Sequence, residues 1–318
     1  MSNKLKVCVV GDGGWGTALG LMLFEQGCHV TMWGPFAEYI DEVHRTRCNS
    51  RYLPDIGIPE GVEWTSDTKL AVQNAKLIIL AVPSHYFSDV CRKFKDFIPV
   101  DADVVSVSKG FCRETGERLS VTASKILGIQ NVAVLSGPSH AEEVARRIPT
   151  AVVAASADIE QAERVQGIMS APYFRIYTTD DSTGVELGGA IKNVIALAVG
   201  MSDGMGFGDN SRAALITRGL AEMARLGTAM GGKPETFAGL SGIGDLVVTC
   251  TSRHSRNRSI GERLGKGESL DSIVKRMKQV AEGVWNCPLV TQLAGSLGVE
   301  MPLCEAVRKV LDSEMTPD

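Results

Sequence analysis

The segment 240–261 places anion-binding side chains close to a single carboxylate. It reads LSGIGDLVVTCTSRHSRNRSIG, in which a glycine-rich turn precedes Asp245 and a short apolar run leads into hydroxyl and guanidinium groups. Arg256 can form a planar, bidentate contact with a phosphate or a carboxylate. Ser255 and Asn257 add neutral donors, and backbone amides at the start of a following helix would favour an anion further. The segment therefore predicts a site for a small oxyanion.

A second segment, 184–200, places a lysine inside an apolar stretch. It reads GVELGGAIKNVIALAVG, which predicts a helix that is apolar nearly all round and central to its domain. Burial would lower the pKa of Lys192, and its neutral amine could take the proton of a secondary alcohol as hydride leaves. The alternative is a lysine whose ammonium group reaches the surface. Asn193 favours the catalytic interpretation, because burying a second polar side chain next to Lys192 doubles the desolvation cost at the same place.

Asp245 has two compatible interpretations. Its carboxylate could orient Lys192 or bind a substrate hydroxyl. It could also cap a helix that begins at Leu246, since Asp is a favoured capping residue.

The N-terminal sequence GDGGWG, residues 11–16, fits the dinucleotide pattern G-x-G-x-x-G. It follows a predicted strand and enters a predicted helix, which is the context this fingerprint requires. Gly11 permits a tight turn, Gly13 lets a pyrophosphate approach the backbone, and Gly16 allows close packing of helix and strand. A simple turn between strand and helix is the less favoured alternative.

The end of the second predicted strand does not distinguish NAD from NADP. An acidic residue often binds the ribose 2'-hydroxyl there, but this chain has Gly34-Pro35, with neither an acid nor an arginine. Glu38 is a possible later acid, although an exposed residue at a helix start is the favoured interpretation. Both cofactors therefore stay open.

Three turns follow predicted strands and should line one edge of the sheet, where such folds bind ligands. They contain His85, Lys109 and the pair Gly137 and Ser139. A cation at Lys109 could meet substrate or cofactor charge, or it could be a solvated surface lysine. For His85 we favour a structural role at a helix start over ligand binding.

Apolar runs alternate with helical patterns up to about residue 180. The predicted strands are short and almost continuously apolar, as buried parallel strands are, and cover 6–10, 29–33, 77–82, 104–108, 132–135, 151–154 and 175–177. The patterns also predict helices, two of them between these strands and the others after them, at 15–26, 119–127, 185–201, 212–230, 269–281, 288–297 and 302–311. The fold class is an α/β doubly wound sheet followed by an all-helical C-terminal domain, with domains 1–180 and 181–318.

Composition narrows the function. The 318 residues carry a net charge of -4, which disfavours a nucleic-acid surface, and no apolar run suggests a membrane span. The eight cysteines lack metal-ligand or CxxC spacing, so we expect no metal site and a reducing, cytoplasmic compartment. The N-terminus leads directly into a strand-like run, so we expect no signal peptide.

Taken together, the motifs resemble the bacterial-type soluble glycerol-3-phosphate dehydrogenase (NAD(P)+) family. The resemblance runs the length of the chain in order and includes GDGGWGTA at 11–18, SKG at 108–110, LSGPSHAEE at 135–143, GGAIKNV at 188–194 and the segment 240–261. The family has a Rossmann-like N-terminal domain and a helical C-terminal domain, usually as a homodimer. Its reaction is the reversible reduction of dihydroxyacetone phosphate to sn-glycerol 3-phosphate, which supplies phospholipid synthesis.

The resemblance also implies roles for individual residues. Lys192 looks like the proton acceptor. Substrate ligands would be Lys109, Gly137, Ser139, Lys192, Asp245, Ser255, Arg256 and Asn257. Cofactor contacts would be Gly11, Gly13, Gly14, Trp15, Gly16, Lys109, Ala141, Arg256 and Glu282, the last within VAEGV at 280–284. The chain departs from the family at Gly34-Pro35, where many members carry His or Arg, which weakens any claim of strong NADP preference.

Two other functions fit parts of the sequence. A β-hydroxyacid dehydrogenase resembles this plan and has an internal Lys-Asn pair, but the motif at 15–18 and the segment 240–261 argue against it. A non-catalytic NAD-binding sensor would need the glycine fingerprint alone, without the buried lysine and the anion cluster.

Overall fold

The computed structural model describes residues 4–276 and 281–318. The chain groups into two compact units, which we describe separately. The first comprises Met1–Ser108, Leu119–Leu135 and Ser139–Asp180, and the second comprises Lys109–Arg118, Ser136–Pro138 and Asp181–Asp318. The two short segments near 109 and 136 thus group with the helical part of the chain, although the first follows a strand of the sheet in sequence and the second begins at the last residue of one.

The first unit is built on an eight-stranded sheet with the order β10-β9-β8-β7-β6-β1-β2-β5. The strands are β1 (Lys6–Val10), β2 (His29–Trp33), β5 (Glu63–Thr65), β6 (Leu77–Leu80), β7 (Asp103–Ser106), β8 (Ala133–Ser136), β9 (Thr150–Ala155) and β10 (Phe174–Thr179). The pairings on both sides of β1 are parallel, as are those of β6 with β7 and β7 with β8. The strand order reverses direction between β1 and β6, which is where doubly wound sheets bind ligands.

All seven strands expected from the sequence are present, with ends that differ by at most two residues. Their burial explains this success, because β1 and β6 are almost wholly buried and read as apolar runs. Strand β5 and the antiparallel pair β3 (Cys48–Asn49) and β4 (Leu53–Gly57) were not predicted. They are short, and β4 is largely exposed, so neither alternation nor a continuous apolar run marks them.

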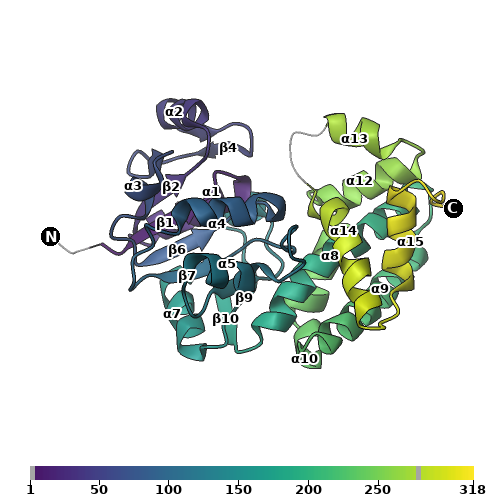
Figure 1. Cartoon of the computed structure of the whole chain (residues 1–318). Coiled ribbons are helices and arrows are strands. Elements are labelled where there is room, and N and C mark those ends of the chain that lie inside the picture. The colour runs from purple at the N-terminus through teal and green to yellow at the C-terminus, as the bar shows by residue number, and fades with distance from the viewer. Residues whose placement is uncertain (1–3, 277–280) are drawn as a thin grey trace. The chain divides into compact units, whose positions relative to one another are not determined.

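Helices surround the strands of this unit (Figure 1). They are α1 (Gly14–Glu25), α2 (Ala37–Thr46), α3 (Thr68–Val72), α4 (Phe87–Phe94), α5 (Leu119–Leu127), α6 (Ala141–Val144) and α7 (Ile159–Met169), with a 3-10 turn η1 (Ser84–Tyr86). The fold class predicted for this part of the chain is confirmed.

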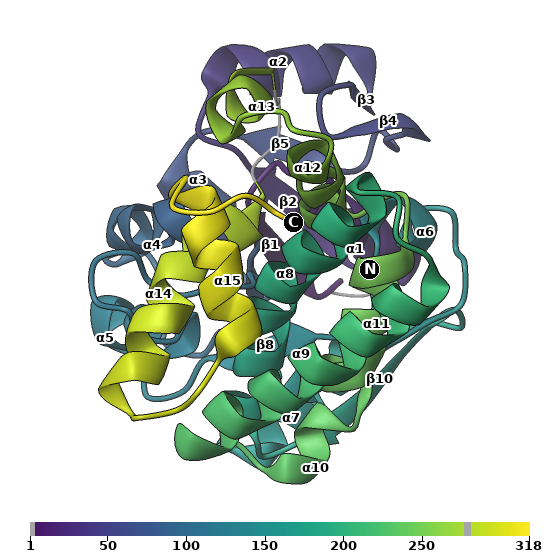
Figure 2. The ribbon, with the colours of Figure 1, turned by 90° about the vertical axis from the view of Figure 1, so that its right-hand side faces the viewer.

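Within its described residues from Asp181 onward, the second unit consists of helices joined by turns and loops. It contains α8 (Ser182–Gly204), α9 (Asp209–Ala229), α10 (Pro234–Phe237), a π-helical turn η2 (Leu240–Gly244), α11 (Asp245–Thr251), α12 (Arg256–Gly265), α13 (Leu270–Arg276), α14 (Glu282–Ser296) and α15 (Pro302–Leu311). Helix α8 is central: α9, α11, α12, α14 and α15 all pack against it (Figure 2). The predicted helix 269–281 runs partly outside the described residues.

Helix α14 begins six residues earlier than the sequence suggested. We expected Pro288 to open the helix, because proline is common at the first helical position. Instead Pro288 lies inside α14, where its missing N–H removes one backbone hydrogen bond. Cys287 and Val290, which lie close to Pro288 in α14, are buried in the core of this unit. Their apolar packing offsets the lost hydrogen bond.

Helix α8 begins and packs as a core helix. Asp181 caps its start by accepting a hydrogen bond from the Gly184 amide at 2.8 Å. Every residue from Gly184 to Ser202 is buried. By length and composition alone α8 could cross a membrane, but its apolar window is fully covered by the protein, as in the core of a soluble domain.

Candidate active site

Three charged side chains of the second unit meet around Asp245. Its Oδ1 accepts a hydrogen bond from Lys192 Nζ at 2.5 Å, and its Oδ2 accepts one from Lys109 Nζ at 2.7 Å. Lys109 Nζ also donates to the Gly137 carbonyl at 3.0 Å. The structure thus brings together four of the predicted substrate-site residues, which lie up to 136 positions apart in sequence.

Lys192 does not reach the surface. The residue is 6% exposed, and it lies in the middle of α8 among apolar neighbours. The surface alternative is therefore wrong: the ammonium group is held inside the unit by Asp245.

Asp245 reaches this position through a local distortion of the backbone. The π-helical turn η2 comes directly before α11, and such wide turns are frequent at functional sites. Helix α11 begins at Asp245 itself, with Gly244 as the preceding residue and no side-chain capping bond. The expectation that Asp245 caps a helix beginning at Leu246 is therefore wrong, because both carboxylate oxygens are directed to lysines.

Thr249 completes the surroundings of Lys192 and was not singled out from the sequence. Lys192 Nζ donates to Thr249 Oγ1 at 2.7 Å, while that hydroxyl donates to the Asp245 carbonyl at 2.6 Å. A spacing of four residues places Asp245 and Thr249 on one face of α11. That spacing is the signal in the sequence that points to Thr249.

The charges at this site shift two pKa values. Burial lowers the pKa of Lys192 to about 8, although Asp245 raises it and Lys109 lowers it further. For Asp245, burial alone would raise the pKa, but the ammonium groups of Lys109 and Lys192 outweigh it and the net pKa is lowered. The site therefore holds a firmly ionised carboxylate beside an amine that can exchange its proton near neutral pH.

The predicted anion ligands lie together at the start of α12. Ser255 caps this helix by accepting a hydrogen bond from the Arg258 amide at 3.3 Å, and it is buried. Arg256 is the first helical residue and is exposed. A pocket of about 180 Å³ adjoins them, lined by Arg253, His254, Ser255, Arg256, Ser259, Ile260 and Arg263. The pocket wall therefore carries three guanidinium groups.

Asn257 links this segment to the helix that carries Lys192. Its Nδ2 donates to Asn193 Oδ1 at 2.8 Å, and its Oδ1 accepts from the Gly283 amide at 2.9 Å. Gly283 follows Glu282, the predicted cofactor contact, which begins α14. Val280, the first residue of that motif, lies outside the described residues.

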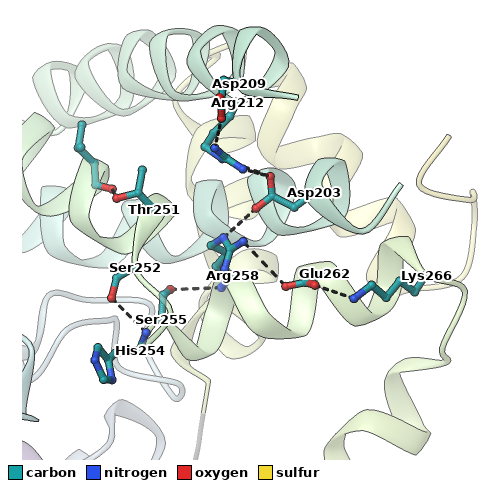
Figure 3. Close-up of polar contacts among 11 residues, drawn as sticks. Asp203, Asp209, Arg212, Thr251, Ser252, His254, Ser255, Arg258, Glu262 and Lys266 are labelled. Atoms are coloured by element: carbon teal, nitrogen blue, oxygen red, sulfur yellow. Dashed lines mark hydrogen bonds and ion pairs between the residues drawn. The ribbon is translucent and has the colours of Figure 1, made fainter. Parts of the chain in front are cut away.

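Arg258 forms an ion pair between helices instead of the expected contact with an anion. The guanidinium groups of the segment 240–261 are expected near an anion, but Arg258 Nε donates to Asp203 Oδ2 at 2.7 Å. Asp203 lies near the end of α8 with its side chain 6% exposed, and it also pairs with Arg212 of α9 at 2.8 Å (Figure 3). Arg258 therefore ties α12 to α8 and α9.

The predicted cofactor residues of the first unit lie in the glycine-rich loop and α1, with Ala141 beside them, whereas Lys109, Arg256 and Glu282 belong to the second unit. Gly11 has a φ of 127°, and its amide donates to the Trp33 carbonyl at 2.9 Å. A Cβ on Gly14 would lie 2.5 Å from the Tyr52 carbonyl oxygen and 3.7 Å from Ala141 Cβ. The structure thus places Gly14 beside Ala141, the first residue of α6. Ser139 belongs to this unit as well, two residues before α6.

This loop suits a pyrophosphate. The residue before α1 is Gly13, which offers no side chain to cap the leading amides of the helix. A Cβ on Gly13 would point into open space, so a ligand can approach the backbone there. The residues present therefore fit the phosphates of a nicotinamide dinucleotide.

Comparisons with known proteins cover both units. Residues 6–162 match the family model for the N-terminus of NAD-dependent glycerol-3-phosphate dehydrogenase, and residues 181–318 match that for its C-terminus. The chain belongs to the NAD-dependent glycerol-3-phosphate dehydrogenase family. It is accordingly an oxidoreductase that acts on a CH–OH group and uses a nicotinamide cofactor.

Curated relatives agree over almost the whole chain. Glycerol-3-phosphate dehydrogenase [NAD(P)+] of Pelotomaculum thermopropionicum is 48% identical over 98% of this chain and 90% of its own length. The enzyme of the same name from Moorella thermoacetica is 49% identical over 97% and 92%. The crystal structure of glycerol-3-phosphate dehydrogenase from Coxiella burnetii has a TM-score of 0.95 at 39% identity, and the match covers 99% of this chain and 96% of that one.

More distant structures share only the fold. A ketopantoate reductase family protein from Ralstonia eutropha has a TM-score of 0.64 at 17% identity. The architecture therefore does not choose among substrates, and the assignment rests on the family match.

Proposed function

We propose that this enzyme interconverts dihydroxyacetone phosphate and sn-glycerol 3-phosphate, with Lys192 exchanging the proton of the C2 oxygen. The observation that carries the role of Lys192 is its bonding to Asp245 Oδ1 and Thr249 Oγ1. Together these contacts account for two of the three N–H bonds of an ammonium group. The remaining tetrahedral position holds a proton in the charged form and a lone pair in the neutral form.

The bound nicotinamide supplies the hydride transfer, and the protein supplies the proton and the orientation. During oxidation of the alcohol, the neutral Lys192 amine accepts the hydroxyl proton at Nζ. During reduction, the ammonium group donates that proton to the forming alkoxide. Asp245 holds the amine in place for both directions, and Lys109 adds a positive charge next to it.

Ser255, Arg256 and Asn257 are proposed to anchor the phosphate. Two of them keep a donor for an oxyanion: Ser255 accepts its capping bond and so retains its O–H, and Asn257 uses one N–H on Asn193 and has a second. Arg256 brings a guanidinium group, which can bind a phosphate in a bidentate manner. The leading amides of α12 favour negative charge at the same place. Anchoring the phosphate fixes the distance from C2 to the reacting groups.

Exchange of Lys192 for methionine tests the proton role. Loss of general acid–base catalysis should lower turnover about 100- to 10,000-fold, while NADH still binds. Lys93→Met is the matched control, because Lys93 is exposed on α4. Near-normal turnover in Lys192→Met would remove Lys192 from its proposed role.

Arg256→Ala tests the anchor. Loss of a charge-assisted contact should raise the KM for dihydroxyacetone phosphate by about 10- to 100-fold. Arg218→Ala, on the exposed side of α9, is the control. An unchanged KM in Arg256→Ala would count against the phosphate anchor.

One assay separates the alternatives for substrate and cofactor. Consumption of NADH and of NADPH is followed with dihydroxyacetone phosphate and with 3-oxo acids in turn. Activity confined to the phosphorylated ketone supports the proposal, whereas activity with the acids favours a β-hydroxyacid dehydrogenase. Binding of NADH without reduction of either substrate would favour a sensor.

We propose further that the enzyme works in the cytoplasm as a homodimer and supplies glycerol 3-phosphate to phospholipid synthesis. All eight cysteines are free, and seven are buried, which suits a reducing compartment. The dimer rests on the family resemblance. Light scattering on the purified protein tests it, and a mass near 34.0 kDa would indicate a monomer.

A further inference from the structure

Asp12 carries a buried carboxylate oxygen that the rest of the described chain leaves unsatisfied. It is the second residue of the glycine-rich loop between β1 and α1, and its Oδ2 atom is buried without a hydrogen-bond partner among the described residues. An acceptor in that condition costs stability, because it has lost water and gained nothing in exchange. Such a cost is expected where a ligand later supplies the missing donor.

The carboxylate lies at the end of β2, where dinucleotide folds place the acid that binds ribose. A Cβ on Gly34, the first residue after β2, would lie 2.9 Å from both Cβ and Oδ2 of Asp12. The amide of Gly11 donates to the carbonyl of Trp33, which fastens the loop to the same strand end. The missing side chain at Gly34 therefore makes room for a carboxylate supplied by another segment.

The loop is held rigidly in this position. Asn49 is fully buried, and its Nδ2 donates to the Asp12 carbonyl at 2.7 Å and to Thr17 Oγ1 at 2.8 Å. Its Oδ1 accepts from the Tyr39 hydroxyl at 2.6 Å. These bonds fix the Asp12 backbone from the end of β3, so the carboxylate is preorganised.

The local charges are mixed. Burial raises the pKa of Asp12, while Arg51 opposes that shift. The Arg51 guanidinium lies over the Tyr39 ring, 4.0 Å from its centre. An acid and an arginine, both missing from the end of β2 in sequence, are thus supplied by two other loops.

We propose that the Asp12 carboxylate accepts a hydrogen bond from the ribose 2'-hydroxyl of NAD and repels the 2'-phosphate of NADP, so that NAD is preferred. The proposal rests on the dehydrogenase function proposed above and assigns cofactor discrimination to the glycine-rich loop. Asp12 is favoured over Arg51 because its oxygen is buried and unsatisfied, whereas Arg51 is exposed.

Binding measured without substrate tests this. Titration calorimetry gives the Kd of NADH and of NADPH for the wild type and for Asp12→Asn, which keeps the side-chain shape. The wild type should bind NADH more tightly. In Asp12→Asn the ratio of the NADPH Kd to the NADH Kd should fall about 10-fold or more, since one charged acceptor is lost and one repulsion is removed.

Glu38→Gln is the matched control, because Glu38 is the other acid near the end of β2 and is exposed in the first turn of α2. Its ratio should stay that of the wild type. The proposal is overturned if Asp12→Asn leaves the ratio unchanged, if Glu38→Gln changes it instead, or if the wild type binds NADPH more tightly through Arg51. Failure to bind either dinucleotide would contradict the dehydrogenase function itself.

Gly34→Ala provides a second approach that leaves the carboxylate intact. The added methyl group would crowd Asp12 and Ile40 Cδ1, the latter at 2.6 Å, and should displace the carboxylate from the ribose position. NADH affinity should therefore fall while thermal unfolding still shows a folded protein. A folded Gly34→Ala with wild-type affinity for both cofactors would also overturn the proposal.

Discussion

The proposed role of Lys192 in both directions of the reaction fits its pKa of about 8, which lies close to neutral pH. A lysine in water has a pKa near 10.4 and would be almost wholly charged. Burial in α8 disfavours the charged form, and Asp245 keeps the amine from being neutralised completely. In the proposed mechanism, the balance between burial and one carboxylate would set the working pH.

The first prediction concerns that balance. The kcat/KM for glycerol 3-phosphate oxidation should rise with pH and level off above about 8, because oxidation needs the neutral amine. Reduction should show the opposite trend, since it needs the ammonium form. Rates across pH 6–10 check both, and an oxidation rate independent of pH in this range would contradict the assignment.

A second prediction uses Lys109, whose charge lowers the pKa of Lys192. Lys109→Met should move the midpoint of the oxidation profile to higher pH, because a repelling charge has been removed. The loss of a substrate contact should also raise KM, but KM alone would not move the midpoint. A midpoint that shifts to lower pH would show that the charge coupling is wrong.

Thr249 carries the third prediction. Thr249→Val removes the hydroxyl that accepts from Lys192 and leaves the shape, so kcat should fall about 10-fold from poorer orientation of the amine. Thr249→Ser should restore most of the loss. Equal kcat values for all three proteins would mean that Asp245 alone positions Lys192.

At the scale of elements, α8 and α12 cross at very close range. A Cβ on Gly200 would lie 2.0 Å from the Arg258 carbonyl oxygen, and one on Gly261 would lie 2.1 Å from that of Leu197. Two glycines thus allow the backbones to touch where the Asp203–Arg258 ion pair joins the same helices. The contact holds the start of α12, and with it Ser255 to Asn257, against the helix that carries Lys192.

The fourth prediction follows from this crossing. Gly200→Ala should lower the free energy of unfolding by at least about 1–3 kcal/mol, because the backbones cannot separate without loss of packing. Gly295→Ala is the control: its Cβ meets nothing within 4 Å on α14, so it should stabilise by about 0.5–1 kcal/mol. Urea unfolding distinguishes the two, and a stable Gly200→Ala would contradict the close crossing.

Sequence patterns predicted the elements better than the contacts between them. Strand β1 and helix α15 match the predicted bounds, because a buried strand and a helix opened by proline have clear local signals. The pairing of Asp245 with Lys109 joins residues far apart in sequence, and only the packing of the unit brings them together. The same holds for Asp12, whose carboxylate lies next to Gly34 at the end of β2, where the sequence showed no acid.

At the scale of the whole molecule, the proposed ligands depend on different units. The glycine-rich loop belongs to the first unit, and Ser255 to Asn257 belong to the second. NADH alone should therefore slow amide hydrogen exchange at residues 11–16, and glycerol 3-phosphate alone should slow it at the start of α12. Mass spectrometry of exchanged peptides checks this fifth prediction, and protection in the opposite unit only would contradict the assigned sites.

The complete burial of α8 also has a consequence during synthesis on the ribosome. The helix ends at Gly204, but its partners α12, α14 and α15 are made later, up to Leu311. Translation adds about 5–20 residues per second, so α8 stays without these packing partners for roughly 5–20 s. During that time a segment as apolar as a membrane span is exposed. The nascent chain is therefore an expected client for chaperones that shield apolar segments until translation is finished.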